Sequence, residues 1–206
     1  YSQEMKIICI GRNYVDHVAE LKNEMPSEPM VFLKPDSALI LNNRPFFYPE
    51  FSNDIHHELE LVVRINRLGK HIQRKFAHKY YDQVGLGIDF TARDIQSKCK
   101  EKGLPWEKAK AFDGSAPLSR LNEIKNKDLS GLNYKLLVNG ELKQEGHPGL
   151  MMFPIDQIIA YVSSFMTLKI GDLIYTGTPA GVGPVKIGDQ LEAYLGDEKL
   201  LDFRVK

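Results

Sequence analysis

The chain is short of the residues and patterns that mark several large classes of protein. Among its 206 residues are only two cysteines, Cys9 and Cys99, which are too few for a disulfide framework and lack the close pairing of a zinc site. Lysine plus arginine and aspartate plus glutamate both total 27, so no net field favours nucleic acid or an anionic membrane surface as a partner. Any charge that matters for function must therefore be local.

Long apolar segments are also missing. No stretch approaches the roughly 20 apolar residues that span a bilayer, and the first residues lack the basic and then apolar pattern of an export signal. We therefore expect a protein of the cytoplasm or of an organelle matrix, without a membrane or nucleic acid partner. Residues 1–4 precede a methionine, and we interpret them as a tag remnant or an extension and give them no weight.

The sequence does contain many short β-type segments, separated by turns rich in Gly, Asp and Asn. This pattern predicts a β-rich α+β fold, and the lack of a low-complexity linker predicts a single domain over residues 1–206. The expected strands cover residues 5–10, 57–65, 84–90, 134–138 and 141–144, with an Asn139-Gly140 hairpin turn between the last two. The expected helices cover residues 13–24, 91–102 and 154–167.

The segment His56-His57-Glu58-Leu59-Glu60-Leu61 is the first candidate site. On a strand, side chains two residues apart share a face, so Glu58 and Glu60 would present neighbouring carboxylates, which repel each other unless a cation lies between them. The same pattern fits an ordinary half-exposed strand, which is the more frequent case. Adjacent histidines on a strand point to opposite faces, so we expect His57 to support the strand rather than to bind zinc.

Asp89 supplies a third carboxylate, at the end of the apolar segment Gly85-Leu86-Gly87-Ile88-Asp89. Taken locally, it fits equally well as the N-cap of the helix that follows. Three carboxylates without cysteine or a well-spaced histidine pair suit a hard cation that prefers oxygen ligands, such as Mg²⁺ or Mn²⁺. The sequence therefore predicts a metal site formed by Glu58, Glu60 and Asp89.

Several short motifs follow one another in a fixed order along the chain. They are Gly11-Arg12-Asn13-Tyr14 with Asp16-His17, Phe32-Leu33-Lys34-Pro35, His57-Glu58-Leu59-Glu60, Asp89-Phe90-Thr91-Ala92-Arg93-Asp94, Gly103-Leu104-Pro105-Trp106, Ala109-Lys110, Thr176-Gly177-Thr178-Pro179 and Gly181-Val182-Gly183-Pro184. In this order the sequence resembles the fumarylacetoacetate hydrolase family, over nearly the whole chain. It is most similar to the branch of short acylpyruvases and oxaloacetate decarboxylases.

The resemblance implies a mixed β-sandwich roll with short helices, assembled as a homodimer, with Mg²⁺ or Mn²⁺ held by Glu58, Glu60 and Asp89. In this family a small 2-oxo acid chelates the metal, which polarises the carbonyl group and stabilises the enolate that is left when a carbon–carbon bond breaks.

Three further residues match catalytic positions of the family. His17 and Glu20 match a dyad on a mobile lid, where the glutamate orients the imidazole and raises its basicity. Lys110 matches a lysine that faces the substrate. Taken alone, His17 and Glu20 would more often be a solvated surface pair, and Lys110 a solvated lysine.

Substrate binding is expected at three other positions. Arg12 lies in the first motif, and Gln96 follows Arg93 by one helical turn, so Gln96 could hydrogen-bond the ligand while Arg93 pairs with a carboxylate. Thr178 matches the position whose hydroxyl and backbone N–H meet the substrate carboxylate. The glycines from 177 to 183 lack the pattern of a phosphate loop and are interpreted as a loop beside the substrate.

The leading functional hypothesis is a metal-dependent enzyme that cleaves a carbon–carbon bond in a small 2-oxo acid, by acylpyruvate hydrolysis or oxaloacetate decarboxylation. The first alternative is an isomerase or tautomerase, acting on oxaloacetate or a 2-hydroxyhepta-2,4-diene-1,7-dioate-like compound, because the same enolate can be reprotonated. A non-catalytic metal-binding scaffold is the second alternative.

Overall fold

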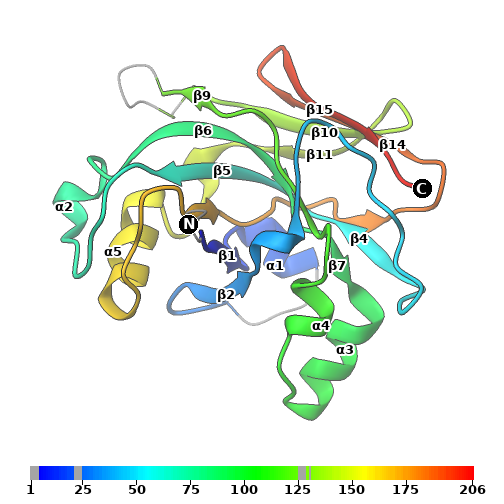
Figure 1. The fold of residues 1–206 in the computed structure, drawn as a ribbon, viewed down its shortest axis with the longest axis horizontal. Coiled ribbons are helices and arrows are strands. Elements are labelled where there is room, and N and C mark those ends of the chain that lie inside the picture. Colours follow the sequence, from blue (N-terminus) through cyan, green and yellow to red (C-terminus); the bar gives the residue numbers. More distant parts are fainter. Residues whose placement is uncertain (1–4, 21–24, 125–128, 130) are drawn as a thin grey trace.

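The computed structural model describes residues 5–20, 25–124, 129 and 131–206. Residues 1–4 and the end of the predicted helix 13–24 therefore lie outside the described residues. Strands dominate and the helices are short, as predicted for a β-rich α+β fold (Figure 1). Among the described residues, no helix combines the length and the apolar character needed to cross a membrane.

The largest sheet has six strands, in the order β2-β1-β12-β5-β6-β9. Their bounds are β1 Ile7–Gly11, β2 Met30–Lys34, β5 Leu59–Ile65, β6 Tyr81–Ile88, β9 Asn122–Glu123 and β12 Leu173–Tyr175. Strands β1 and β12 pair in parallel, whereas the other neighbours are antiparallel. Strand β5 lies inside this sheet, and its first five residues are all buried. This part of β5 is thus covered on both faces, which places its side chains in the interior.

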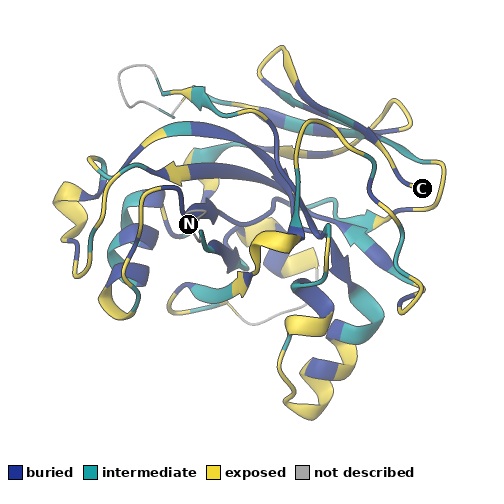
Figure 2. Ribbon diagram, viewed as in Figure 1, coloured by how far each residue is buried: buried dark blue, intermediate teal, exposed yellow. Residues whose placement is uncertain are grey.

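A second sheet of four antiparallel strands, in the order β11-β10-β14-β15, packs with β10 against β5 and with β14 and β15 against β6. The strands are β10 Tyr134–Val138, β11 Glu141–Gly146, β14 Gln190–Leu195 and β15 Glu198–Arg204. The predicted hairpin is confirmed, since Asn139 and Gly140 both adopt positive φ angles, of 53° and 81°. The two sheets enclose the main core, which extends in sequence from Ile8 to Val205 (Figure 2).

Short elements complete the fold at the sheet ends. The small strands are β3 Leu39–Ile40, β4 Ile55–His57, β7 Thr91–Ala92, β8 Ala116–Pro117 and β13 Gly183–Pro184. The helices are α1 Val15–Glu20, α2 Arg74–Ala77, α3 Arg93–Lys102, α4 Glu107–Lys110 and α5 Ile155–Phe165, with 3-10 turns η1 Asp36–Ala38 and η3 Pro148–Leu150. Helices α3 and α4 project from one end of the molecule (Figure 1). Both carry buried residues toward the body and exposed residues outward (Figure 2).

The predicted strand 57–65 is divided in the structure. Strand β4 ends at His57 and β5 begins at Leu59, so Glu58 lies in the break between them. The Leu59 N–H donates to the Gln144 side chain (2.9 Å). This tertiary hydrogen bond forms where the strand is interrupted, which the local pattern of the sequence does not reveal.

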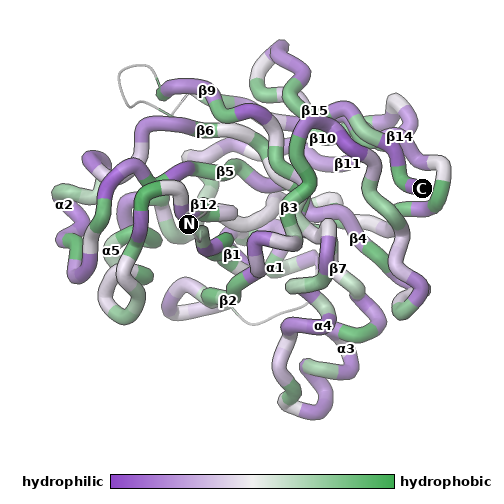
Figure 3. The backbone as a smooth tube through the Cα atoms, viewed as in Figure 1, coloured by the Kyte–Doolittle hydropathy of each residue, from purple (hydrophilic) through white to green (hydrophobic). Residues whose placement is uncertain are grey.

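Two turns share the sequence Lys-Ile-Gly-Asp, at residues 169–172 and 186–189. In each, the glycine has a positive φ angle, of 95° or 100°, and the aspartate accepts a hydrogen bond from the lysine N–H (2.7 Å in both). Their surroundings differ, because Asp172 is fully buried and also binds the Lys6 ammonium (2.6 Å) and the Lys6 N–H (2.9 Å). Because the two turns have the same sequence, the hydropathy colours of Figure 3 do not distinguish them, but Lys186, Ile187 and Gly188 of the second turn are all exposed.

These twin turns give a matched pair of variants. Asp172→Ala removes the buried carboxylate that accepts from the N–H groups of Lys6 and Lys169 and pairs with the Lys6 ammonium, so we expect it to lower the free energy of unfolding by about 3 kcal/mol. Asp189→Ala removes the same turn contact, together with an exposed hydrogen bond from the Asn139 amide (2.8 Å), at a partly exposed site, so we expect a loss of about 1 kcal/mol or less. Urea unfolding of both variants measures the difference, and equal losses would contradict the structural role given to the Lys6–Asp172 pair.

Candidate metal centre

Glu58, Glu60 and Asp89 meet in the interior of the protein. Glu58 lies between β4 and β5, Glu60 is the second residue of β5, and Asp89 follows β6, which pairs with β5. Their exposed fractions are 5%, 1% and 1%, and one oxygen from each lies within 4.8 Å of the others. The half-exposed strand considered for the two glutamates is therefore wrong. The N-cap interpretation of Asp89 is wrong too, because Ala92 is the N-cap of α3.

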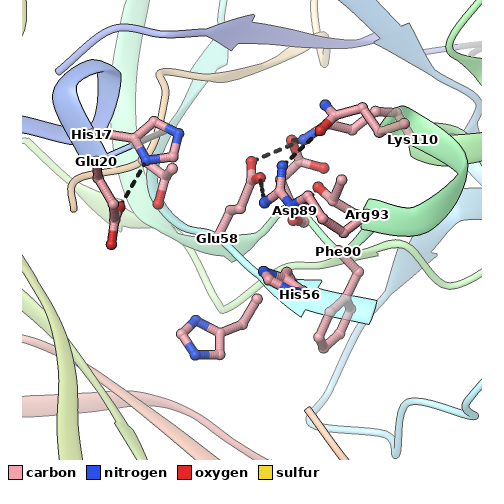
Figure 4. Close-up of polar contacts among 12 residues, drawn as sticks. His17, Glu20, His56, Glu58, Asp89, Phe90, Arg93 and Lys110 are labelled. Atoms are coloured by element: carbon pink, nitrogen blue, oxygen red, sulfur yellow. Dashed lines mark hydrogen bonds and ion pairs between the residues drawn. The ribbon is translucent and has the colours of Figure 1, made fainter. Parts of the chain in front are cut away.

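Two cations, Arg93 on α3 and Lys110 on α4, contact the carboxylates of this centre (Figure 4). The Lys110 ammonium lies 2.9 Å from Glu58 Oε2 and 2.7 Å from Asp89 Oδ2. The Arg93 guanidinium lies 2.6 Å from Glu58 Oε1. Lys110 is buried, so the solvated lysine considered from the sequence is wrong, whereas Arg93 pairs with a carboxylate as the sequence indicated.

The third cation is Lys34, at the end of β2, whose role was not predicted from the sequence. Its ammonium lies 2.8 Å from Asp89 Oδ1 and donates hydrogen bonds to Ser115 O (3.1 Å), Ser115 Oγ (3.0 Å), Phe90 O (3.3 Å) and the Lys110 carbonyl. A single lysine in an otherwise apolar strand that ends at Pro35 is the signal that could have pointed to it. Lys34 thus anchors both Asp89 and the backbone that carries Lys110.

The surroundings of Glu58 and Glu60 shift the pKa values of these two carboxylates in opposite directions. Burial opposes the ionisation of Glu58, but Lys110 and Arg93 outweigh it, so the pKa of Glu58 lies well below its ordinary value. Burial, then Asp89 and then Glu58 raise the pKa of Glu60 well above its ordinary value. Among the described residues Glu60 has no ion-pair partner within 4.0 Å, and Oε2 accepts from the Gly177 N–H (2.7 Å). Glu60 is therefore the carboxylate that most lacks a positive charge.

This donor set fits an oxygen-ligated divalent cation. The three side chains offer only carboxylate oxygens, the ligands preferred by Mg²⁺ and Mn²⁺. Asp89 Oδ1 is buried and has no hydrogen bond among the described residues, although Lys34 lies nearby. A cation here would supply the positive charge that Glu60 lacks.

His17 and Glu20 lie on α1 beside this centre (Figure 4). His17 Nδ1 contacts Glu20 Oε2 at 3.3 Å, and the Glu20 carboxylate accepts a hydrogen bond from the Gly181 N–H (3.1 Å). His17 is only 4% exposed, so it is not the solvated surface residue considered above. Burial lowers the pKa of His17, although Glu58 and Glu20 act in the opposite direction. The imidazole is therefore neutral at pH 7 and can accept a proton.

Arg12, Gln96 and Thr178 line the same small cavity as His17 and Lys110, with an open volume of about 30 Å³. Gln96 Oε1 accepts from Arg93 (2.7 Å), which leaves its NH₂ group for another partner. Arg12 adopts a left-handed backbone with φ of 56°, which costs a non-glycine residue about 1 kcal/mol.

Thr178 is more constrained than the sequence suggested. Its hydroxyl donates to Leu59 O (2.8 Å) and accepts from Gln144 Nε2 (2.8 Å). The hydroxyl proton is therefore committed to the backbone of β5. Only the backbone of Thr178 is left to offer an N–H to a ligand.

Gln144, on β11, is a supporting residue that the sequence analysis missed. Its amide nitrogen also donates to Pro179 O (3.0 Å), and its oxygen accepts from the Leu59 N–H and contacts His57 Nδ1 (2.9 Å). Because an amide oxygen only accepts, His57 carries its proton on Nδ1. His57 thus supports the strand, as expected, and one buried glutamine joins the second sheet to the carboxylate strand.

Asn13, also missed, fixes the segment next to Arg12. Its fully buried amide donates to Thr176 O (2.7 Å) and Phe153 O (3.1 Å) and accepts from the Phe153 N–H (2.7 Å). Gly177 packs so closely here that a Cβ atom would lie 2.6 Å from Asn13 Cβ. Because the Asn13 amide is fixed and Gly177 has no side chain, the loop that carries Arg12 can lie close to Glu60.

Comparison with known proteins decides the family. Residues 6–205 match the model of the fumarylacetoacetate (FAA) hydrolase C-terminal domain. This chain belongs to the fumarylacetoacetate hydrolase family. It is 45% identical over 201 residues to the mitochondrial oxaloacetate tautomerase FAHD1 of Bos taurus, covering 97% of this chain and 91% of that protein.

Two further members of the family show its range. The mitochondrial oxaloacetate decarboxylase of Dictyostelium discoideum is 46% identical over 189 residues, or 91% of this chain and 87% of that one. The crystal structure of a fumarylpyruvate hydrolase from Pseudomonas aeruginosa, in complex with Mn²⁺ and pyruvate, superposes with a TM-score of 0.92 at 32% identity, covering 98% of this chain and 89% of that one. The family resemblance and the fold expected from it are confirmed.

The raised pKa of Glu60 gives a prediction about the metal-free protein. Folded Glu60 keeps its proton to a higher pH than unfolded Glu60, so stability falls as pH rises from about 4.5 toward the folded pKa, by up to about 1.4 kcal/mol per pH unit. Glu60→Gln, which cannot titrate, removes this decrease. Urea unfolding in chelator between pH 5 and 8 measures it.

The exposed Glu141→Gln serves as the control, since it should retain the wild-type pH dependence. If wild-type protein and Glu60→Gln lose stability equally across this range, Glu60 does not carry the uncompensated charge.

Proposed function

We propose that the protein is a divalent-metal-dependent enzyme that cleaves a carbon–carbon bond in a small 2-oxo acid by way of an enolate, as acylpyruvate hydrolases and oxaloacetate decarboxylases do. The observation that carries this proposal is the group of three buried carboxylates with Glu60 lacking a cation, facing a cavity that His17 also lines. The names of the relatives point to the same class of small oxo acids.

Glu58, Glu60 and Asp89 would hold the metal. When bound, Mg²⁺ or Mn²⁺ supplies a Lewis acid that polarises the 2-oxo group. Lys110 remains within reach of Glu58 and Asp89, so its ammonium can also stabilise negative charge that develops on a substrate oxygen. The Lys34 ammonium donates to the Lys110 carbonyl and is itself fixed by Ser115 and Asp89. Lys34 therefore fixes the backbone that carries Lys110.

His17 is proposed to move the proton. A Glu20 carboxylate accepts hydrogen bonds but does not donate them, so His17 carries its own hydrogen on Nδ1 and presents Nε2 as the basic atom. The lowered pKa keeps Nε2 unprotonated at pH 7. It can take a proton from a water molecule in hydrolysis or return one to the enolate carbon. Glu20 orients the imidazole and, through Gly181, fixes α1 against the loop.

The remaining cavity residues are proposed to bind the substrate. The NH₂ group of Gln96 and the backbone N–H of Thr178 can donate to the 2-oxo acid, and the Arg12 guanidinium can pair with a carboxylate. The open volume of about 30 Å³ leaves room for water-sized groups. We propose that α1 moves as a lid to admit the substrate.

Tautomerisation of oxaloacetate, or of a 2-hydroxyhepta-2,4-diene-1,7-dioate-like compound, is the second candidate. It is favoured by the name of the relative from Bos taurus, an oxaloacetate tautomerase, and by the small cavity, which limits water near His17. Both candidates use His17 for proton transfer and differ in whether a carbon–carbon bond breaks.

We further propose that the chain acts as one catalytic domain and as a homodimer, in the cytoplasm or, in a eukaryote, in an organelle matrix. The mitochondrial names of the relatives from Bos taurus and Dictyostelium discoideum support the matrix for a eukaryotic source.

A turnover screen tests the proposal. With Mg²⁺ or Mn²⁺, we expect the protein to turn over at least one of acetylpyruvate, fumarylpyruvate and oxaloacetate. Pyruvate release measures cleavage, and hydrogen–deuterium exchange at C3 measures tautomerisation. Glu60→Gln should remove metal-dependent turnover, and His17→Gln should lower kcat about 10²–10⁴-fold, because the neutral amide cannot accept the proton.

Glu141→Gln, exposed on the second sheet, is the control and should keep wild-type rates. Exchange without pyruvate release would replace cleavage by tautomerisation. Metal binding without turnover of any of the three acids would refute the catalytic proposal.

A further inference from the structure

Lys100 is a cation in the wall of the catalytic cavity to which the proposed function gives no role. It lies on α3, seven residues after Arg93 and four after Gln96, and all three line the cavity. Residues with this spacing share one face of a helix, and seven residues advance the axis by roughly 10 Å. Because Arg93 contacts Glu58, Lys100 lies farther along the cavity wall from the carboxylate group than Arg93 does.

The charge of Lys100 is not neutralised within the described part of the chain. Its ammonium has no ion pair there, and its contact is with the ring of Trp106, 5.9 Å from the centroid. Trp106 also belongs to the cavity wall. The lysine is exposed at the mouth of this wall, and the ring gives it a weak cation–π contact without supplying an anion.

Arg12 adds a second unpaired cation on the same cavity. Glu58 and Asp89 are occupied by Arg93, Lys110 and Lys34, while Arg12 has no ion pair among the described residues. Burial, then Arg93 and then Arg12 lower the pKa of Lys100, as expected where like charges are crowded together. The cavity wall therefore has an excess of positive charge away from the carboxylates.

From this arrangement we infer that Lys100, together with Arg12, binds a second carboxylate of the substrate and so selects 2-oxo dicarboxylates over 2-oxo monocarboxylates. This inference rests on the proposed function for the position of the first carboxylate, near Gln96 and Thr178. A dicarboxylate brings one negative charge to each end of the cavity. A monocarboxylate leaves Lys100 and Arg12 without an anion.

Two pairs of ligands that differ in the distal carboxylate test this inference. Malate and lactate are inert 2-hydroxy acids, and oxaloacetate and acetylpyruvate are matched substrates. The variant is Lys100→Met, which keeps an unbranched side chain over Trp106 but removes the charge. Lys102→Met, an exposed lysine on the same helix that does not line the cavity, is the control.

Calorimetric titration of the Mg²⁺-loaded protein should show that wild type and Lys102→Met bind malate at least tenfold more tightly than lactate. Lys100→Met should lose this preference, and Lys100→Arg should restore most of it. In turnover, Lys100→Met should lower the ratio of kcat/KM for oxaloacetate to that for acetylpyruvate at least tenfold, mainly through KM. A charge-assisted hydrogen bond is strong enough for this change.

Equal binding of malate and lactate by the wild-type protein, or no binding of either, would overturn the inference. So would a Lys100→Met variant that keeps the preference, or one that weakens both ligands equally, which indicates a structural role. Failure of the proposed function gives a different result. The wild-type protein would then turn over neither oxaloacetate nor acetylpyruvate, but it could still bind malate more tightly than lactate.

Discussion

The arrangement of the site depends on the neutralisation of charge buried at the end of strands β5 and β6. Burying a carboxylate is costly unless a cation or several hydrogen bonds accompany it. Lys110 and Lys34 contact Asp89, and Lys110 and Arg93 contact Glu58. These cations come from three separate elements, so the charge requirement draws β2, α3 and α4 toward the same point.

Rigid polar contacts hold this point in place from both sheets. Gln144 reaches from the second sheet to the backbone of β5 and to Thr178, and Asn13 joins the segment after β1 to Thr176 and Phe153. Buried polar groups of this kind are stable only when all of their hydrogen bonds are made, which restricts the side chains to one arrangement. His17, on α1, faces this preformed site.

Local patterns predicted much of this molecule. The Asn139-Gly140 turn and the end of helix α3 at Gly103 both follow from backbone conformations that few other residues adopt. The grouping of Glu58, Glu60 and Asp89 followed from strand periodicity and from the family motifs. Lys34 and Gln144 were missed because their partners are distant in sequence, and a sequence pattern shows neither burial nor hydrogen-bond geometry. The sign of the pKa shift of His17 was missed for the same reason.

The most direct test of the account is the number of protons released when Mn²⁺ binds to the metal-free protein at pH 7, measured by calorimetry in two buffers of different ionisation enthalpy. If Glu60 holds a proton until a cation replaces it, binding releases a proton, in an amount that approaches about one as pH falls below its pKa. Release that increases from pH 7 to pH 6 agrees with the account. Binding without any proton release at either pH would contradict it, because the carboxylate group would then already carry its full negative charge.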